Sequence, residues 1–98
     1  SIEQKAEHVQ TTLDELVDKY PQMQGELRGR GLMQGIACGS EGLAEKICTA
    51  AFENGLIIET SGPEDEVVKI LPPLTIDESG LTTGLNILDE SINHVLNK

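Results

Sequence analysis

The sequence predicts an α/β fold of the α+β kind, a two-layer sandwich with helices on one face of a small, mainly antiparallel sheet. The segments at the two ends of the chain place apolar residues every three or four positions, as amphipathic helices do. The middle of the chain contains β-branched segments, and turn residues join the last two of these into a hairpin. The predicted order is α-β-α-β-β-α. Because the chain has 98 residues and no linker, we expect a single domain, residues 1–98.

The first helix is predicted from Ile2 to Tyr20, and Pro21 ends it. The segment Leu27–Cys38 has no helical stripe and contains three glycines, each of which penalises a helix interior. We predict one strand there, with apolar side chains on both faces and therefore a central place in the sheet. The residues on its two faces are Leu32 with Ile36, and Met33 with Ala37.

The second helix is expected to begin at Ser40, a residue type that caps helices well, and to end at Asn54-Gly55. Leu56–Thr60 reads as a short strand, and residues 61–65 are typical of a turn. These features predict that the chain reverses direction there and continues into another strand.

That last strand is predicted at Glu66–Leu71, because Pro72-Pro73 cannot continue a hydrogen-bonded ladder. Asp77 then begins the final helix. Its apolar stripe consists of Leu81, Leu85, Leu88, Ile92 and Val95. The other face of the sheet would need a partner, which fits a domain taken from a larger protein, as does a chain that starts inside a helix.

The charge of the chain excludes several classes of partner. It carries 17 acidic against 7 basic residues, a net charge of -10, which argues against nucleic acid and against an anionic membrane surface. The sequence contains no apolar run long enough to span a membrane. Cys38 and Cys48 stand apart, without a metal-ligand pattern, so we expect buried, reduced thiols in a cytoplasmic protein, and no metal.

Residues 28–35, "RGRGLMQG", could form a glycine loop that binds phosphate, or they could serve packing. A phosphate loop follows a strand and opens a helix, whereas these glycines lie before and within the predicted strand. The context favours packing. The glycines then allow close backbone approach or a bulge, and Arg28 and Arg30 are surface or interdomain ion-pair donors.

Among the other polar residues, Lys69 is the one candidate site residue. A lone lysine in a strand is usually an exposed charge that protects a sheet edge, and the alternative is a contact with a carboxylate of a ligand or another domain. The acidic residues Asp14, Glu15 and Asp18 read as a solvated helix face. The two histidines, His8 and His94, read as helix-surface residues, so the sequence predicts no catalytic constellation within the chain.

Three stretches, "LRGRGLMQGI", "AFENGLIIETSG" and "VVKILPPLTIDESGL", together resemble the C-terminal small domain of class III aminotransferases. These are fold type I enzymes that use pyridoxal phosphate. Within the family, the sequence resembles the members of ectoine biosynthesis that make 2,4-diaminobutyrate and 2-oxoglutarate from aspartate 4-semialdehyde and glutamate. The resemblance implies that the parent enzyme is a cytoplasmic transaminase, and that family relatives are dimers or larger.

The resemblance also implies where the chemistry lies. The cofactor lysine and the phosphate-binding residues belong to a large domain outside this chain, so the chain alone should be inactive and bind no pyridoxal phosphate. Many relatives have an arginine at the position of Lys69 that holds the substrate α-carboxylate, and lysine offers only a single compact charge there. Glu59, Thr60 and Ser61 belong to a segment that approaches the cleft between domains.

Two other functions are compatible with the same fold. The chain could be a stand-alone regulatory module that binds a small molecule such as an amino acid, or an oligomerisation domain. Saturable binding of amino acids or oxo acids to the isolated chain would favour the first, and sedimentation would test the second.

Overall fold

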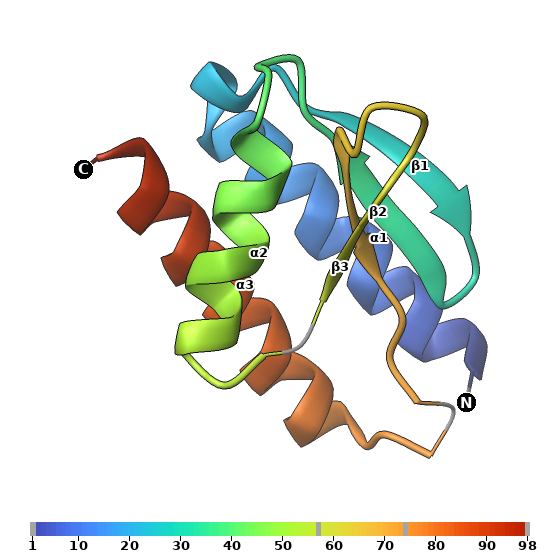
Figure 1. Cartoon of the computed structure of the whole chain (residues 1–98). Coiled ribbons are helices and arrows are strands. Elements are labelled where there is room, and N and C mark those ends of the chain that lie inside the picture. The colour runs from blue at the N-terminus through green and yellow to red at the C-terminus, as the bar shows by residue number, and fades with distance from the viewer. Residues whose placement is uncertain (1, 57, 74, 98) are drawn as a thin grey trace.

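The computed structural model describes residues 2–56, 58–73 and 75–97, and it places three helices on one face of a four-stranded antiparallel sheet (Figure 1). This arrangement confirms the predicted fold class. The helices are α1 (Ile2–Lys19), α2 (Leu43–Glu53) and α3 (Glu78–Leu96), and the strands are β1 (Glu26–Arg30), β2 (Met33–Ala37), β3 (Glu59–Ser61) and β4 (Val67–Ile70). The strands lie in the order β1-β2-β4-β3.

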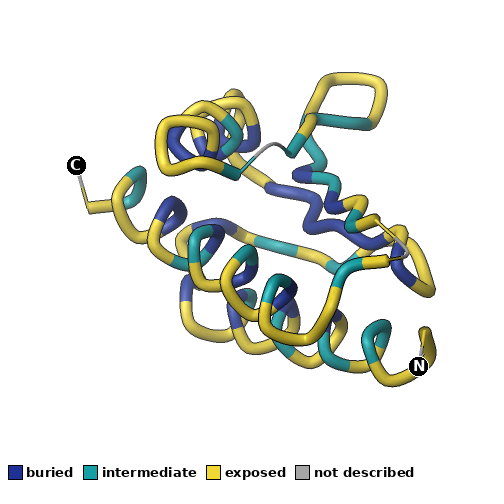
Figure 2. The backbone as a smooth tube through the Cα atoms, turned by 90° about the horizontal axis from the view of Figure 1, so that it is seen from below, coloured by how far each residue is buried: buried dark blue, intermediate teal, exposed yellow. Residues whose placement is uncertain are grey.

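The core fills the space between the helices and the sheet. Helix α1 packs on β1 and β2, α2 packs on β3 and β4, and α3 lies against both other helices. Figure 2 shows the result, since the buried stretches are those where strands and helices face one another. The core is largely aliphatic, as a chain with 2% aromatic residues requires. Its most deeply buried members include Leu13, Met23, Ile36, Ile47, Val68, Leu88 and Ile92.

The segment predicted as one strand, Leu27–Cys38, is a hairpin of two strands, β1 and β2. Arg30 pairs with Met33, so Gly31 and Leu32 form a two-residue turn. Gly31 has φ +63°, the positive value that tight hairpin turns require at their first position. The prediction of one continuous strand was wrong because this glycine was taken as a packing residue and not as a turn. The expected central strand is β2, which lies between β1 and β4.

Strand β4 is one residue shorter at each end than predicted, and two other boundaries differ more. Helix α2 begins at Leu43 after Gly42, whose φ is +76°, and no side chain caps it, so the assignment of Ser40 as the cap was wrong. The backbone oxygen of Ser40 accepts a hydrogen bond from the Leu43 N–H instead, at 3.3 Å. Strand β3 begins at Glu59 and not at Leu56, and Ile57 lies outside the described residues.

The start and the apolar stripe of the last helix agree with the sequence. The Asp77 side chain accepts a hydrogen bond from the Gly80 N–H at 2.7 Å, as an N-cap does. The stripe residues Leu81, Leu85, Leu88 and Ile92 are buried, and Val95 is half-buried.

Polar contacts join α1 to α3 at both ends of their apolar interface. His8 Nδ1 lies 2.8 Å from Glu78 Oε2, and Lys19 Nζ donates to Asp89 Oδ2 at 2.9 Å. The hydroxyl of Tyr20 also donates to the Asp89 carboxylate. Burial disfavours the charged form of Asp89, but the hydrogen bonds from Tyr20 and Lys19 and the Lys19 charge outweigh it, so the pKa of Asp89 lies below its ordinary value.

Candidate functional site

The candidate site lies on the face of the sheet that the helices do not cover. Side chains alternate between the two faces of a strand, and the cross-strand row that contains Ile36 and Val68 points into the core. The next row therefore points outward. We call it the outer row. It consists of Arg28, Gly35, Lys69 and Glu59, paired in register across all four strands.

Gly35 creates a gap in the middle of the outer row. A β-carbon at this position would clash with the backbone oxygen of Val68 on β4, so a side chain does not fit there without a backbone shift. A hollow of about 350 Å³ lies over this gap, bordered by Arg28, Met33, Lys69 and residues of the turn after β3. The backbone thus provides a shallow concavity next to a cation, which is a suitable place for an anionic group.

Lys69 lies between two hollows. The second, of about 250 Å³, is lined by Ile58, Glu59, Lys69 and Leu71. Lys69 is half-buried, and among the described residues the structure gives it no ion pair. Strand β4 lies between β2 and β3, so the interpretation of Lys69 as a charge that protects a sheet edge was wrong. The alternative, contact with an external carboxylate, remains compatible with this geometry.

The segment predicted to approach a cleft lies in part beside Lys69. Glu59 is directly opposite Lys69, Ser61 borders the larger hollow, and Thr60 lies in the row that faces the helices. The hydroxyl of Thr60 donates to Asp65 across the turn, at 3.3 Å. The outer row therefore brings together Lys69 and Glu59, whereas Thr60 serves the turn.

Within the "RGRG" stretch, Gly29 allows close backbone approach, as the sequence context predicted, whereas Gly31 forms the hairpin turn. A β-carbon on Gly29, which has φ +85°, would clash with the backbone oxygen of Met33 across the hairpin. Arg28 Nη1 lies 2.9 Å from Glu26 Oε1, in an exposed ion pair. Helix α2 begins only at Leu43, so the glycines do not open a helix, and the phosphate-loop geometry is not formed.

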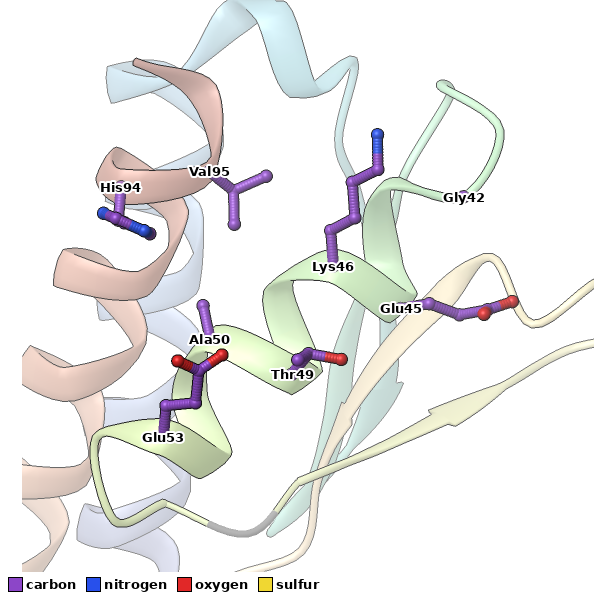
Figure 3. A pocket seen from close by; sticks show the side chains of 8 residues that line it. All are labelled: Gly42, Glu45, Lys46, Thr49, Ala50, Glu53, His94 and Val95. Atoms are coloured by element: carbon purple, nitrogen blue, oxygen red, sulfur yellow. The ribbon is translucent and has the colours of Figure 1, made fainter. Parts of the chain in front are cut away.

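A separate open groove of about 670 Å³ runs between α2 and the end of α3. Figure 3 shows Lys46 and Glu53 on α2 and His94 on α3 at its borders, with Val95 and Ala50 between the helices. His94 is exposed, as expected for a helix-surface residue. The three polar side chains come from the outer surfaces of their helices and form no hydrogen-bonded cluster among the described residues, so we assign this groove no chemistry.

An apolar groove of about 130 Å³ lies where β4 leads into α3. Ile70, Leu71 and Pro72 form one side, and Leu81 and Leu85 of α3 form another. This groove places the double proline beside the second hollow, because Leu71 borders both. The sequence indicated the proline stop but gave no signal for either hollow, since both depend on strand register.

The remaining polar residues have structural explanations. Asp14, Glu15 and Asp18 are exposed on α1, as predicted. Cys38 is buried, Cys48 is half-buried and both are reduced, and burial raises the pKa of each thiol to about 11. Among the described residues, no three His, Cys, Asp or Glu side chains gather as a metal site would require. None of the described helices combines the length and the hydropathy that a membrane crossing needs.

Comparison with models of protein families identifies the family of this chain. The family model described as Aminotransferase class-III matches residues 1–92. The chain belongs to the class III aminotransferase family. The sequence resemblance is thereby confirmed, and it covers α1 as well as the strands that carried the motifs.

Two curated relatives of this class III aminotransferase chain carry the same name. Diaminobutyrate–2-oxoglutarate transaminase of Virgibacillus pantothenticus is 56% identical over 98 residues, which is 100% of this chain and 24% of the relative. The enzyme of the same name from Oceanobacillus iheyensis is 50% identical over 98 residues, which is 23% of its length. The chain thus spans about a quarter of the length of these relatives.

Solved structures agree on the fold. N-acetylornithine aminotransferase from Stenotrophomonas maltophilia superposes with a TM-score of 0.85 at 24% identity, over 98% of this chain and 26% of that one. Lysine aminotransferase from M. tuberculosis superposes with a TM-score of 0.84 at 22% identity, over 94% of this chain and 21% of that one.

Proposed function

We propose that this chain is the C-terminal small domain of a pyridoxal-phosphate transaminase that moves an amino group from glutamate to aspartate 4-semialdehyde. The products would be 2,4-diaminobutyrate and 2-oxoglutarate, and the enzyme would be a cytoplasmic homo-oligomer of ectoine biosynthesis. One observation carries the proposal: 56% identity, along the whole chain, to an enzyme named diaminobutyrate–2-oxoglutarate transaminase.

The proposed reaction balances without an outside oxidant. The C2–N bond of glutamate is replaced by a C2 carbonyl, and the C4 carbonyl of the aldehyde is replaced by a C4–N bond. Carbon C2 of glutamate is oxidised and C4 of the aldehyde is reduced by the same amount. The chemistry that pyridoxal phosphate supplies when bound is to hold the amino group between the two substrates.

The described residues do not fit a pyridoxal-phosphate site by themselves. Such a site needs a lysine in an enclosed pocket. Lys5, Lys19 and Lys46 lie on helices at the surface, with Lys19 paired to Asp89, and Lys69 borders shallow hollows that open to the surface. Lys98 lies outside the described residues. We therefore propose that the cofactor is held by a large domain, and that the outer face of this sheet forms one wall of the cleft between the domains. Closing such a cleft excludes water from the reaction.

Absorbance titration tests this division of roles. Pyridoxal phosphate added to the isolated chain should give no stoichiometric Schiff-base band, whereas the full-length enzyme should give one. A stoichiometric band from the isolated chain would overturn the assignment. Calorimetry that finds saturable amino-acid binding to the isolated chain would instead favour a regulatory module.

Activity of the full-length enzyme is the direct test of the function. We expect formation of 2,4-diaminobutyrate from aspartate 4-semialdehyde with glutamate as the amino donor. A full-length enzyme that turns over N-acetylornithine or lysine, but not 2,4-diaminobutyrate, would refute the substrate assignment while leaving the family unchanged.

Lys69 is the residue of this chain that we propose to contact the substrate, through the α-carboxylate of glutamate or 2-oxoglutarate. Lys69→Ala in the full-length enzyme should raise KM for both by about tenfold or more, which is the worth of a charge-assisted hydrogen bond. Lys46→Ala is the matched control, because Lys46 is an exposed lysine on α2, away from the outer row. Unchanged kinetics in Lys69→Ala would remove Lys69 from the site.

A further inference from the structure

We propose that Asn54 is a site of spontaneous deamidation, and that the turn after α2 controls how fast the reaction proceeds. Asn54-Gly55 is the one place in the sequence where an asparagine precedes a glycine. Both residues are exposed, at the point where α2 ends and the chain turns towards β3 (Figure 1). The modification is a chemical property of the chain itself and is independent of the proposed transaminase reaction.

The reaction needs only water, and it balances in two steps. The backbone nitrogen of Gly55 loses its proton to solvent and attacks the side-chain amide carbon of Asn54. The new C–N bond closes a five-membered succinimide ring, and the amide nitrogen takes up a proton and leaves as ammonia. Water then adds to one of the two imide carbonyl carbons and breaks its bond to nitrogen. The product is aspartate or, when water attacks the main-chain carbonyl, isoaspartate.

Gly55 leaves its nitrogen open to this attack. A glycine has no side chain that would crowd the nitrogen or restrict the backbone rotation that the attack needs. A β-carbon built at Gly55 would meet no atom within 4 Å beyond its chain neighbours, so the space around the turn is open. Asn86 and Asn93 in α3 precede an isoleucine and a histidine, whose side chains hinder the corresponding nitrogen.

The folded turn holds the reacting atoms apart. Asn54 has ψ 10°, which turns the Gly55 nitrogen towards the Asn54 backbone nitrogen and away from the Asn54 side chain. Asn54 Nδ2 donates to the backbone oxygen of Ala50 at 3.0 Å, and the Gly55 N–H donates to that of Phe52 at 3.0 Å. Attack therefore requires the turn to open and both hydrogen bonds to break. Exposed helix ends open more readily than core elements, so the fold slows the reaction without abolishing it.

Deamidation would weaken the end of α2. A carboxylate at position 54 cannot donate to the Ala50 oxygen, and it lies at the negative end of the helix dipole. Glu53 already places one carboxylate beside it, and the last turn of α2, all of it within the described residues, contains no basic residue. Isoaspartate also adds a methylene to the main chain, between α2 and the strand β3 that borders the candidate site.

Peptide mapping by mass spectrometry tests the site and its control by the fold, with the full 98-residue chain incubated at neutral pH. In the folded chain, deamidation should be faster at Asn54 than at Asn86 and Asn93, which are internal controls. Unfolding in guanidinium chloride should speed the reaction at Asn54 by about tenfold or more, because two hydrogen bonds no longer oppose it. Asn54→Gln is the matched variant. Its longer side chain cyclises far more slowly, so position 54 should stay unmodified over the same period.

Deamidation at Asn54 that is no faster than at Asn86 and Asn93 in the folded chain would remove the site. Equal rates at Asn54 in the folded and the unfolded chain would show that the turn does not control the reaction. Asn54→Asp reproduces one product and should lower the thermal unfolding midpoint by about 5 °C. Asn86→Asp, which adds the same charge at an exposed position in the middle of α3, should lower it less. Equal midpoints for Asn54→Asp and the parent chain would overturn the effect on α2.

Discussion

The two faces of the sheet differ sharply although the same strands form both. On β2, Ile36 faces the helices and is 1% exposed, whereas Met33 faces outward and is 62% exposed. On β4, Val68 is buried in the core, and its neighbour Lys69 points to the uncovered face between two hollows. One face is a packed aliphatic core, and the other combines charges, a glycine gap and exposed apolar atoms.

This difference separates the residues that hold the fold from those available for contact. The inner face is complementary to α1, α2 and α3, so substitutions there remove packing. The described residues form no covering layer over the outer face. Substitutions there should change recognition more than stability, except at Gly35, where a β-carbon would clash with the neighbouring strand. The predictions that follow test this separation, from the largest expected effect to the smallest.

Truncation on the two faces of β2 gives the strongest contrast. Ile36→Ala should lower the free energy of unfolding by about 2–5 kcal/mol, because it leaves a cavity in a close-packed core. Met33→Ala on the same strand should change it by about 0.5 kcal/mol or less, as exposed sites do. Urea denaturation of the chain measures both. Equal losses in the two variants would mean that the outer face is covered in solution.

Two glycine substitutions should change the stability of the chain in opposite directions. Gly35→Ala should destabilise the chain by about 1–3 kcal/mol, because the new methyl group meets the backbone oxygen of Val68. Gly84→Ala in α3 should stabilise it by up to about 1 kcal/mol, because its nearest neighbour, Leu56 Cδ1, lies at an ordinary 3.5 Å and alanine favours helix. The thermal unfolding midpoints of both variants, compared with that of the parent chain, measure these changes. A neutral Gly35→Ala would show that β2 and β4 can separate at the floor of the hollow.

The contact of Tyr20 and Lys19 with Asp89 on α3 should contribute a smaller, pH-dependent amount to the free energy of unfolding. Tyr20→Phe should cost about 1 kcal/mol at neutral pH, as the loss of a hydrogen bond does. Asp89 has a lowered pKa in the folded chain. Its contribution is therefore fully present above the ordinary aspartate pKa of about 3.9 and is lost as the pH falls through the lowered value.

The acid dependence of that contact gives a second measurement. Between about pH 5 and pH 2, Tyr20→Phe should lose less stability than the parent chain, because one of the hydrogen bonds that favour the ionised form of Asp89 is gone. Urea titrations at several pH values measure this. Parallel stability curves for the two proteins would show that Tyr20 does not influence Asp89.

Local patterns predicted most of the helices and only part of the sheet. The cap at Asp77 and the stripe from Leu81 to Ile92 follow from short-range rules and were confirmed. The turn at Gly31 was missed, because a glycine with neighbours that fit a strand is compatible with a bulge, close packing or a turn. Ser40 is a good cap by type, but the helix begins three residues later, after a glycine with positive φ.

The sequence by itself determined the class of fold and the family, and it predicted Lys69 as the residue to test. Periodicity, capping residues and turn chemistry act over a few positions, so they can be read along the chain. Tertiary structure decided that Glu59 lies opposite Lys69, that Gly35 opens a hollow beside it, and that β4 is an interior strand. Those features depend on the register between strands far apart in sequence, which the packing of the whole core selects.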